Sequence, residues 1–187
     1  MQRCGWVTQD PLYLTYHDTE WGVPEKRSQR LFEMLCLEGQ QAGLSWITVL
    51  KKRENYRRLF HQFDPHAVAK MTDADIERLV QDAGIIRHRG KITAIIGNAR
   101  AFLAMEAAGE SFSDFIWGFV DNQPRDNQRA SLAGVPASTP ESDAMSKALK
   151  KRGFKFVGST ICYAFMQACG LVNDHVTSCF CHPQAPR

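Results

Sequence analysis

Apolar residues recur at helical spacing along most of this chain. The clearest pattern lies between Ile92 and Leu103, where apolar residues stand at positions i, i+3, i+4 and i+7, which places them on one face of an α-helix. The same spacing predicts helices that follow Ser28 and Trp46, and a shorter helix over residues 113–120. No segment alternates apolar and polar residues for long enough to indicate a β-sheet. The pattern therefore predicts an all-α protein.

Polar residues mark where several of these helices begin. Ser28 can cap the helix that follows it. Asp64 offers a capping oxygen directly before Pro65, which lacks the N–H group that a first helical turn leaves unpaired. Thr72 and Asp75 have the spacing of a capping box, in which each residue caps the other's backbone.

Glycines mark the predicted helix ends, because glycine readily adopts the left-handed backbone that terminates many helices. The expected ends are Gly84 for the helix begun by Thr72, Gly153 for a helix begun by Thr139 and Pro140, and Gly170 for an apolar helix over 158–169. Residues 121–140 are polar and contain prolines, which predicts a long connection. We expect residues 1–187 to form a single domain, with room for two small helical lobes.

Length and composition narrow the class of protein. The 187 residues are 44% hydrophobic, which is enough to form a folded core. The net charge of +3 is too small to prove a polyanionic partner. The first residues lack the apolar run of a signal peptide, and no later stretch is long and apolar enough to cross a bilayer. We therefore expect a cytoplasmic protein with no membrane partner. Its six cysteines are then expected to be thiols, as core residues or metal ligands.

Cysteine and histidine residues near the two ends of the chain together offer a complete tetrahedral ligand set for zinc. These residues are Cys4 and His17 near the start, and His175 and Cys179, four positions apart, near the end. Cys181 and His182 compete for the same role. Core cysteines and surface histidines without a metal are an equally good interpretation of the spacing. Four protein ligands leave no open position for water, so such a zinc would be structural.

The segment between the two best-defined helices has the features of a DNA-binding hairpin. Gly84 permits a tight turn, and Arg87, Arg89 and Lys91 surround the start of the next helix. Free N–H groups at a helix start attract phosphate, and a helix-hairpin-helix motif uses them to hold one DNA strand without reading sequence. On spacing alone, an ordinary helical turn with solvated charges is the better interpretation.

The first quarter of the chain is rich in aromatic residues. They are Trp6, Tyr13, Tyr16, Trp21 and Trp46. Flat rings can enclose a flat nucleobase, and tyrosine hydroxyls can bind its edge. Glu38 stands among apolar and small neighbours, where a carboxylate can accept a hydrogen bond from an adenine amino group and favour a cationic base. Core packing explains any one aromatic residue as well, and an exposed helix position explains Glu38.

Long segments of the sequence resemble the bacterial 3-methyladenine DNA glycosylase I family. The resemblance covers the whole length and rests on RCGWV, YHDTEWGVP, LFEMLCLEGQQAGLSWITVLKKRENYR, GIIRHRGKI and KRGFKFVGSTICYAFMQACGLVNDH. It implies a helix-hairpin-helix glycosylase fold, a base pocket, and a structural zinc that joins the N- and C-terminal segments. It further implies base-excision repair of alkylated double-stranded DNA: hydrolysis of the N-glycosidic bond of flipped 3-methyladenine, with free base and an abasic site as products.

The resemblance also implies roles for individual residues. Cys4, His17, His175 and Cys179 correspond to the zinc ligands. Glu38 corresponds to the carboxylate that recognises the methylated base, Tyr16 joins it in hydrogen bonding, and Trp46 stacks on the base. Trp6, Tyr13 and Trp21 correspond to residues that line the same pocket.

Other parts of the mechanism are less defined by the sequence. The family lacks the usual catalytic aspartate after the hairpin, and Asp143 and Asp174 are only loosely placed candidates for a general base. Gly43 and Leu44 are the best-placed wedge to fill the gap that a flipped base leaves, although Leu44 in the core is the simpler interpretation. No lysine lies in a motif for a Schiff base, so we expect no lyase step. We expect a monomer.

Three other functions fit part of the sequence. A zinc-stabilised DNA-binding module without catalysis explains the hairpin and the metal ligands, but not aromatic residues around a carboxylate. Direct repair by methyl transfer to a cysteine is suggested by the number of cysteines. A bifunctional glycosylase-lyase would nick the strand after removing the base.

Overall fold

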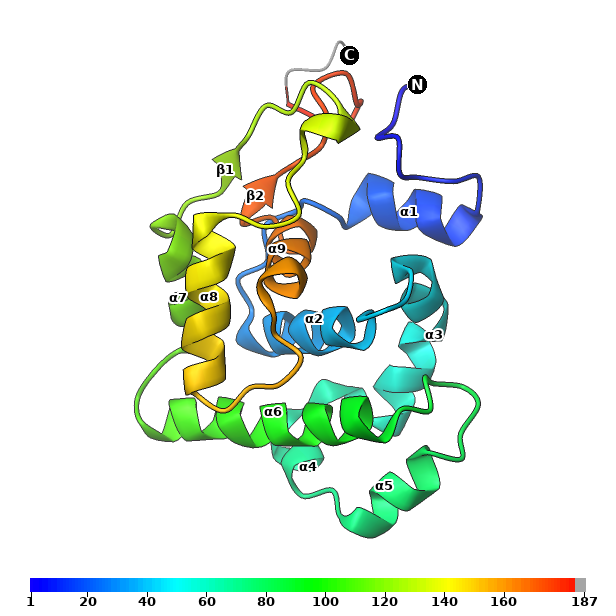
Figure 1. The fold of residues 1–187 in the computed structure, drawn as a ribbon, viewed down its shortest axis with the longest axis vertical. Helices are drawn as coiled ribbons and strands as arrows, with labels where there is room; N and C mark the ends of the chain where they lie inside the picture. Colours follow the sequence, from blue (N-terminus) through cyan, green and yellow to red (C-terminus); the bar gives the residue numbers. More distant parts are fainter. Residues whose placement is uncertain (184–187) are drawn as a thin grey trace.

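The computed structural model describes residues 1–183 as a mostly helical protein (Figure 1). Its α-helices are α1 (Pro11–Thr19), α2 (Ser28–Gln40), α3 (Trp46–Leu59), α4 (Pro65–Ala69), α5 (Asp73–Leu79), α6 (Arg89–Ala107), α7 (Phe112–Trp117), α8 (Pro140–Lys151) and α9 (Ser159–Ala168). Short 3₁₀ turns are η1 (His61–Phe63), η2 (Gly118–Val120) and η3 (Leu132–Gly134). The first residues and the last described residues lie near each other at one end of the molecule, where the Phe180 N–H donates to the Gln2 carbonyl at 2.9 Å.

Helix α2 is the centre of the core. It packs against α3, α6, α7 and α9, and Figure 1 shows these elements around it. Leu31, Phe32, Leu35 and Leu37 of α2 are completely buried, so α2 is apolar on most of its circumference, as a helix enclosed by neighbours must be. The carboxyl end of this rigid helix carries Glu38.

Several predicted helix boundaries are confirmed. Asp64 caps α4 by accepting from the His66 backbone N–H at 3.0 Å, and Thr72 and Asp75 form a capping box at the start of α5. Thr139 caps α8. Gly153 and Gly170 follow α8 and α9 in the left-handed region, with φ of 94° and 73°. Helix α6 contains the whole Ile92–Leu103 pattern.

Two predicted boundaries are wrong. Ser28 is the first residue of α2 and not its cap, and its hydroxyl accepts from the Ser113 backbone N–H at 3.0 Å. Helix α5 ends at Leu79, well before Gly84, and Gly84 is not among the glycines with positive φ. A Cβ at this position would lie 2.9 Å from Asp82 Oδ1 and 3.1 Å from Asn55 Nδ2, so a larger residue would displace these side chains.

Two features were not expected. Helix α1 begins with Asp10 as cap and Pro11 as first residue, the same signal that marks α4. The long connection before α8 contains strand β1 (Arg125–Asp126), which pairs in parallel with β2 (Val172–Asn173). This pair fastens the connection to the segment after α9, and it qualifies the all-α prediction only slightly.

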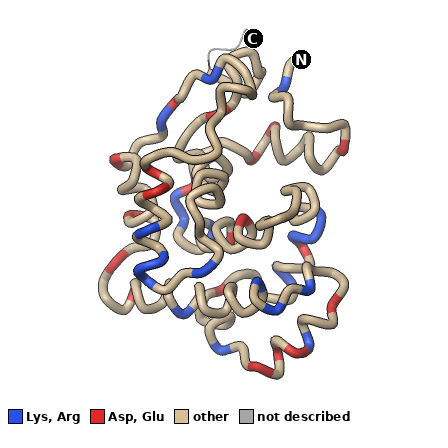
Figure 2. Tube along the Cα trace, in the orientation of Figure 1, with Lys and Arg blue, Asp and Glu red and all other residues tan. Residues whose placement is uncertain are grey.

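No helix in residues 1–183 is both long and apolar enough to cross a membrane. Figure 2 shows Lys and Arg residues distributed over α3, α6 and α8, with acidic residues frequent on α5. Charge alone therefore does not define one binding face.

Candidate functional site

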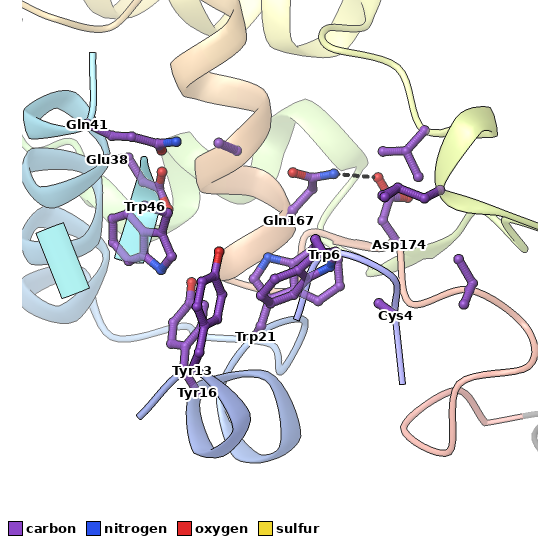
Figure 3. A pocket seen from close by; sticks show the side chains of 14 residues that line it. Cys4, Trp6, Tyr13, Tyr16, Trp21, Glu38, Gln41, Trp46, Gln167 and Asp174 are labelled. Carbon is purple, nitrogen blue, oxygen red and sulfur yellow. Dashed lines mark hydrogen bonds between the residues drawn. The ribbon is translucent and has the colours of Figure 1, made fainter. Parts of the chain in front are cut away.

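A cavity of about 220 Å³ lies where the N-terminal segment, α1, the end of α2, the start of α3 and α9 meet (Figure 3). It is lined by all five aromatic residues singled out above, namely Trp6, Tyr13, Tyr16, Trp21 and Trp46, together with Glu38. The cavity is somewhat smaller than the roughly 300–1,000 Å³ of pockets for drug-sized ligands, which suits a small flat molecule.

The aromatic residues pack on one another and so give the cavity rigid walls. The ring of Trp6 lies 5.1 Å from that of Tyr13 and 5.0 Å from that of Trp21, between centroids. On the other side, the rings of Tyr16 and Trp46 lie 5.7 Å apart. Inclined contacts of this kind are favourable, and they hold several ring faces and edges toward the cavity.

Glu38 is the one acidic side chain of α2 that faces this cavity. It is only 3% exposed, and burial raises the pKa of its carboxyl to about 8. Within residues 1–183 no group donates a hydrogen bond to this carboxyl, and burial is the one cause of its raised pKa. A buried carboxyl without a partner is costly, so this group is suited to a ligand that brings hydrogen-bond donors or positive charge.

The indole N–H of Trp46 is a second polar group without a partner. Trp46 is the first residue of α3, and its Nε1 is buried with no hydrogen bond to any described residue. Buried donors are nearly always paired. The cavity therefore presents both a carboxyl and an N–H group that a bound molecule can satisfy.

Sequence reasoning missed Gln41 and Gln167 as lining residues and placed Asp174 only loosely. Gln167 Nε2 donates to Asp174 Oδ2 at 3.0 Å, as Figure 3 shows. The Asp174 carboxylate also accepts from Asn127 at 2.8 Å, from Arg129 at 3.2 Å and from the Tyr163 hydroxyl. Nothing in the spacing of these residues indicated that they would meet, because they converge only in the folded chain.

Four buried side chains next to the cavity could hold a metal ion. They are Cys4, His17, His175 and Cys179, whose ligand atoms all lie within 4.8 Å of one another. Cys4 Sγ lies 3.5 Å from His175 Nδ1, and Cys179 Sγ lies 3.5 Å from both His175 Nδ1 and His17 Nε2. The fold thus joins the two halves that the sequence separates by more than 150 residues.

The second nitrogen of each histidine in this cluster has its own partner. His17 Nδ1 lies 2.8 Å from Asp18 Oδ1, and Asp18 is held by Arg3. His175 Nε2 lies 2.8 Å from the Trp21 carbonyl. Such acceptors commonly fix the orientation of metal-binding imidazoles. Burial lowers the pKa of His175 to about 4, which keeps this ring neutral, as a metal ligand must be.

The two competing candidates lie outside this four-residue set. His182 Nε2 is 3.0 Å from Asp126 Oδ1. Cys181 is half-buried and lies with His17 and Asp18 in a second, smaller group. Neither belongs to the buried cluster of two cysteines and two histidines.

The basic residues of the hairpin differ in their surroundings. Arg87 and Arg89 are exposed, and Arg89 is paired with Glu77. Lys91 is buried, and its ammonium donates to the backbone carbonyls of Gln40 at 3.0 Å and Ala42 at 2.6 Å. Its expected contact with DNA does not fit this position, because the ammonium faces the end of α2.

Leu44 and Gly43 lie in the turn between α2 and α3. Leu44 is 42% exposed, so the interpretation of this side chain as a core residue is wrong. Gly43 has a φ of 78°, which favours glycine. Asp143, by contrast, is not among the cavity residues and accepts a hydrogen bond of 2.5 Å from the Ser159 hydroxyl.

Comparison with known proteins identifies the family of this chain. The family model for methyladenine glycosylase matches residues 6–182. The chain is 73% identical to DNA-3-methyladenine glycosylase 1 of Escherichia coli K12, over 98% of each chain. It is 62% identical to DNA-3-methyladenine glycosylase of Haemophilus influenzae Rd, over 96% of this chain and 97% of that one. The chain therefore belongs to the methyladenine glycosylase family.

Solved structures share the fold. A crystal structure of 3-methyladenine DNA glycosylase I superposes with a TM-score of 0.97 at 74% identity, covering 97% of this chain and 100% of the other. A Y16F variant of 3-methyladenine DNA glycosylase I in complex with 3-methyladenine superposes with a TM-score of 0.94 at 41% identity, covering both chains completely.

Proposed function

We propose that this protein is a DNA-3-methyladenine glycosylase that acts in base-excision repair of alkylated double-stranded DNA. It hydrolyses the N-glycosidic bond of 3-methyladenine, releases the free base and leaves an abasic site. The observation that carries this proposal is the unpaired, buried Glu38 carboxyl in an aromatic cavity. The names of its relatives support the same substrate, as does the related structure with 3-methyladenine.

The cavity chemistry suits a flipped, methylated adenine. Methylation at N3 gives the base in DNA a positive charge, and its amino group is a hydrogen-bond donor. Glu38 accepts from that amino group, Tyr16 contributes a second hydrogen bond, and Trp46 stacks on the ring. Trp6, Tyr13 and Trp21 complete the walls. Ring faces favour a cation by roughly 0.5–2 kcal/mol, which helps to discriminate the lesion from neutral adenine.

The charged leaving group reduces what the protein must do for catalysis. When water attacks the sugar carbon, the electrons of the broken bond move to the base and neutralise its charge. We assign no general base, because four donors already occupy Asp174 and Asp143 is outside the cavity. No lysine lines the described cavity, which supports hydrolysis without a lyase step, since that step needs an amine for a Schiff base.

We propose zinc as the metal of the Cys/His cluster, in a structural role. With Zn–S of about 2.3 Å and Zn–N of about 2.0–2.1 Å, tetrahedral angles give an S···N distance of roughly 3.5 Å, close to the 3.5 Å separations in the cluster. Four ligands leave no position for water. The cluster shares a wall with the cavity through Trp6, whose ring lies 5.2 Å from that of His17, so the ion would stabilise the pocket.

DNA is held, in this proposal, by two surface segments. The hairpin before α6 contributes Arg87 and Arg89 to the phosphate backbone in a helix-hairpin-helix arrangement, with Gly84 in the connection. The turn with Gly43 carries the exposed Leu44, which fills the gap left by the flipped base. We leave Lys91 out of this surface because its ammonium is buried against α2.

The direct test is chromatography of the bases that purified protein releases from methylated duplex DNA. We expect free 3-methyladenine, released with multiple turnovers and without a strand nick or a borohydride-trapped adduct. Stoichiometric methyl transfer to a cysteine without base release would contradict the proposal. That alternative is disfavoured because Cys4, the cysteine lining the cavity, is buried, and burial raises its thiol pKa to about 12. Binding without release would leave only a DNA-binding module.

A further inference from the structure

The turn between α8 and α9 carries two exposed residues between two buried ones. Phe154 and Val157 are each 1% exposed and anchor the turn in the core. Between them, Lys155 and Phe156 point outward, and Phe156 is 36% exposed. The buried residues on both sides of this pair hold its backbone at the surface.

The backbone of this turn is held in an unusual conformation. Phe156 has a φ of 57°, a region that bulky residues rarely adopt. The Asn98 side chain of α6 holds the preceding peptide units, accepting from the Lys155 N–H at 2.8 Å and donating to its carbonyl at 3.2 Å. Residues in such conformations persist where the surroundings fix them, and they occur often at ligand-binding sites.

Helix α2 also fits closely against Phe156. A Cβ at Gly39 would lie 3.0 Å from the Phe156 carbonyl oxygen and 3.2 Å from Phe156 Cβ. Gly39 directly follows Glu38, so the turn packs on the same helical end that carries the cavity carboxyl. Figure 1 shows the turn, between α8 and α9, passing between α2 and α6.

The Phe156 ring lies beside the hairpin before α6, and this hairpin contacts the turn that carries Gly43 and Leu44. The Phe156 ring lies 6.1 Å from the ring of His88 and perpendicular to it, and His88 caps the start of α6. In the same first turn, Lys91 holds the Ala42 carbonyl, two residues before the exposed Leu44. Three segments therefore meet around the start of α6.

The charge here is positive. Arg87 and Lys155 are exposed, and no ion pair involves either within residues 1–183. Arg89 is the basic residue of this region that is neutralised, by Glu77. Unpaired cations beside an exposed ring suit DNA, because most protein–DNA hydrogen bonds go to phosphate oxygens and sugars.

We propose that the turn Gly153–Gly158 is a third DNA-binding segment, in which Phe156 packs on a deoxyribose or base beside the lesion and Lys155 binds a phosphate. The inference rests on the proposed function and extends its DNA surface. The fixed backbone keeps the ring exposed before DNA arrives, so binding does not have to order it.

The test replaces Phe156 with a residue that accepts the same backbone. Asparagine adopts positive φ readily, so Phe156→Asn should keep the melting temperature of the parent. Its affinity for a short duplex with a tetrahydrofuran abasic site should fall about tenfold, within the range measured for lost base–aromatic stacking. Its affinity for free 3-methyladenine should not change. Val23→Asn is the matched control, because Val23 is exposed but lies in the segment between α1 and α2.

Lys155→Gln provides the second measurement. The slope of log affinity against log salt should decrease in magnitude by about one, as expected for one lost phosphate contact. Unchanged duplex affinity in Phe156→Asn, together with an unchanged slope in Lys155→Gln, would overturn the inference. Equal losses of duplex affinity, free-base affinity and melting temperature would also overturn it, because the turn would then only support α2. Base release by the parent is scored separately, so its absence would contradict the glycosylase proposal and leave the duplex-binding result interpretable.

Discussion

At the scale of single residues, the surroundings of Glu38 distinguish it from the other buried carboxyl of α2. The sequence placed this residue among apolar neighbours, and the structure encloses it with aromatic rings and no hydrogen-bond donor from the described residues. Glu33, five positions earlier on α2, is also buried but is paired with Arg30 and Arg57. Glu33 therefore stabilises the fold through its ion pairs, whereas the carboxyl of Glu38 is available to a ligand.

The raised pKa of Glu38 predicts how stability depends on pH. Its folded pKa of about 8 lies above the ordinary value of 4.5, so between these pH values the folded protein retains a proton that the unfolded chain releases. The contribution of this carboxyl to stability is therefore lost as pH rises toward 8. Between about pH 5 and 8, chemical denaturation should show the parent losing stability relative to Glu38→Gln. Parallel curves for the two proteins would contradict a buried, unpaired carboxyl.

At the scale of elements, the hairpin and the end of α2 form one unit. Lys91 donates to the carbonyls of Gln40 and Ala42, and Gln40 Nε2 donates to the Lys91 carbonyl at 3.1 Å. The Tyr56 hydroxyl joins this network by donating to Gln40 Oε1 and accepting from the Ile86 N–H. These hydrogen bonds fix the proposed DNA-binding hairpin relative to the turn that carries Leu44.

Removing the Lys91 ammonium should therefore weaken this connection. We expect Lys91→Met to lower the free energy of unfolding by about 1–3 kcal/mol, because two buried carbonyls lose their charged donor. Denaturant unfolding measures the loss. Lys52→Met is the control, since Lys52 donates to one carbonyl, that of Ala83, from an exposed position, and it should cost less. Similar small losses in both variants would show that Lys91 does not stabilise the end of α2.

The two hairpin arginines should differ in their contribution to DNA binding. Arg87→Glu should weaken binding to damaged and undamaged duplexes alike and flatten the salt dependence. Arg89→Glu should have the smaller effect on binding, because Glu77 already neutralises Arg89. Fluorescence anisotropy over a range of salt concentrations measures both. Salt slopes equal to that of the parent would place these arginines away from phosphate.

Helix boundaries were the most predictable part of the fold, because capping is local. Asp64–Pro65 and Thr139 correctly predicted the starts of α4 and α8. Asp10–Pro11 has the same pattern at the start of α1, which was not predicted. Lys91 shows the limit: it shares the buried face of α6 with Ile95 and Asn98, at i+4 and i+7. Its charge suggested the surface, and only packing against α2 reveals the carbonyls that accept from it.

At the scale of the whole molecule, the Cys/His cluster joins the ends of the chain beside the cavity. Cys4 lies two residues before Trp6, and His175 bonds to the carbonyl of Trp21, so two walls of the cavity depend on the cluster. The sequence showed two cysteines and two histidines suited to bind zinc, but it could not show that the fold brings all four together. Gln41 and Gln167 were not recognisable, because a polar side chain gives no local sign of the cavity it will face.

Metal should therefore be required for stability. We expect about one zinc per chain, lost together with thermal stability in Cys4→Ser or Cys179→Ser, because metal binding energy contributes directly to folding. Cys181→Ser should retain zinc and melt close to the parent, since Cys181 lies outside the four-residue set. Metal analysis and thermal denaturation test this. Zinc retained by both ligand variants, with unchanged melting, would contradict the assignment.

The central claim is that Glu38 recognises the methylated base, and calorimetric titration with free 3-methyladenine tests it most directly. In a titration above pH 8, where the Glu38 carboxyl is ionised, Glu38→Gln should lose about 1.5–3 kcal/mol of binding free energy, the value of a hydrogen bond to a charged group. A parallel assay with undamaged duplex DNA should show almost no change, because other segments hold the duplex. Unchanged affinity for the free base would contradict the account, and equal loss in both assays would indicate general unfolding instead of lost recognition.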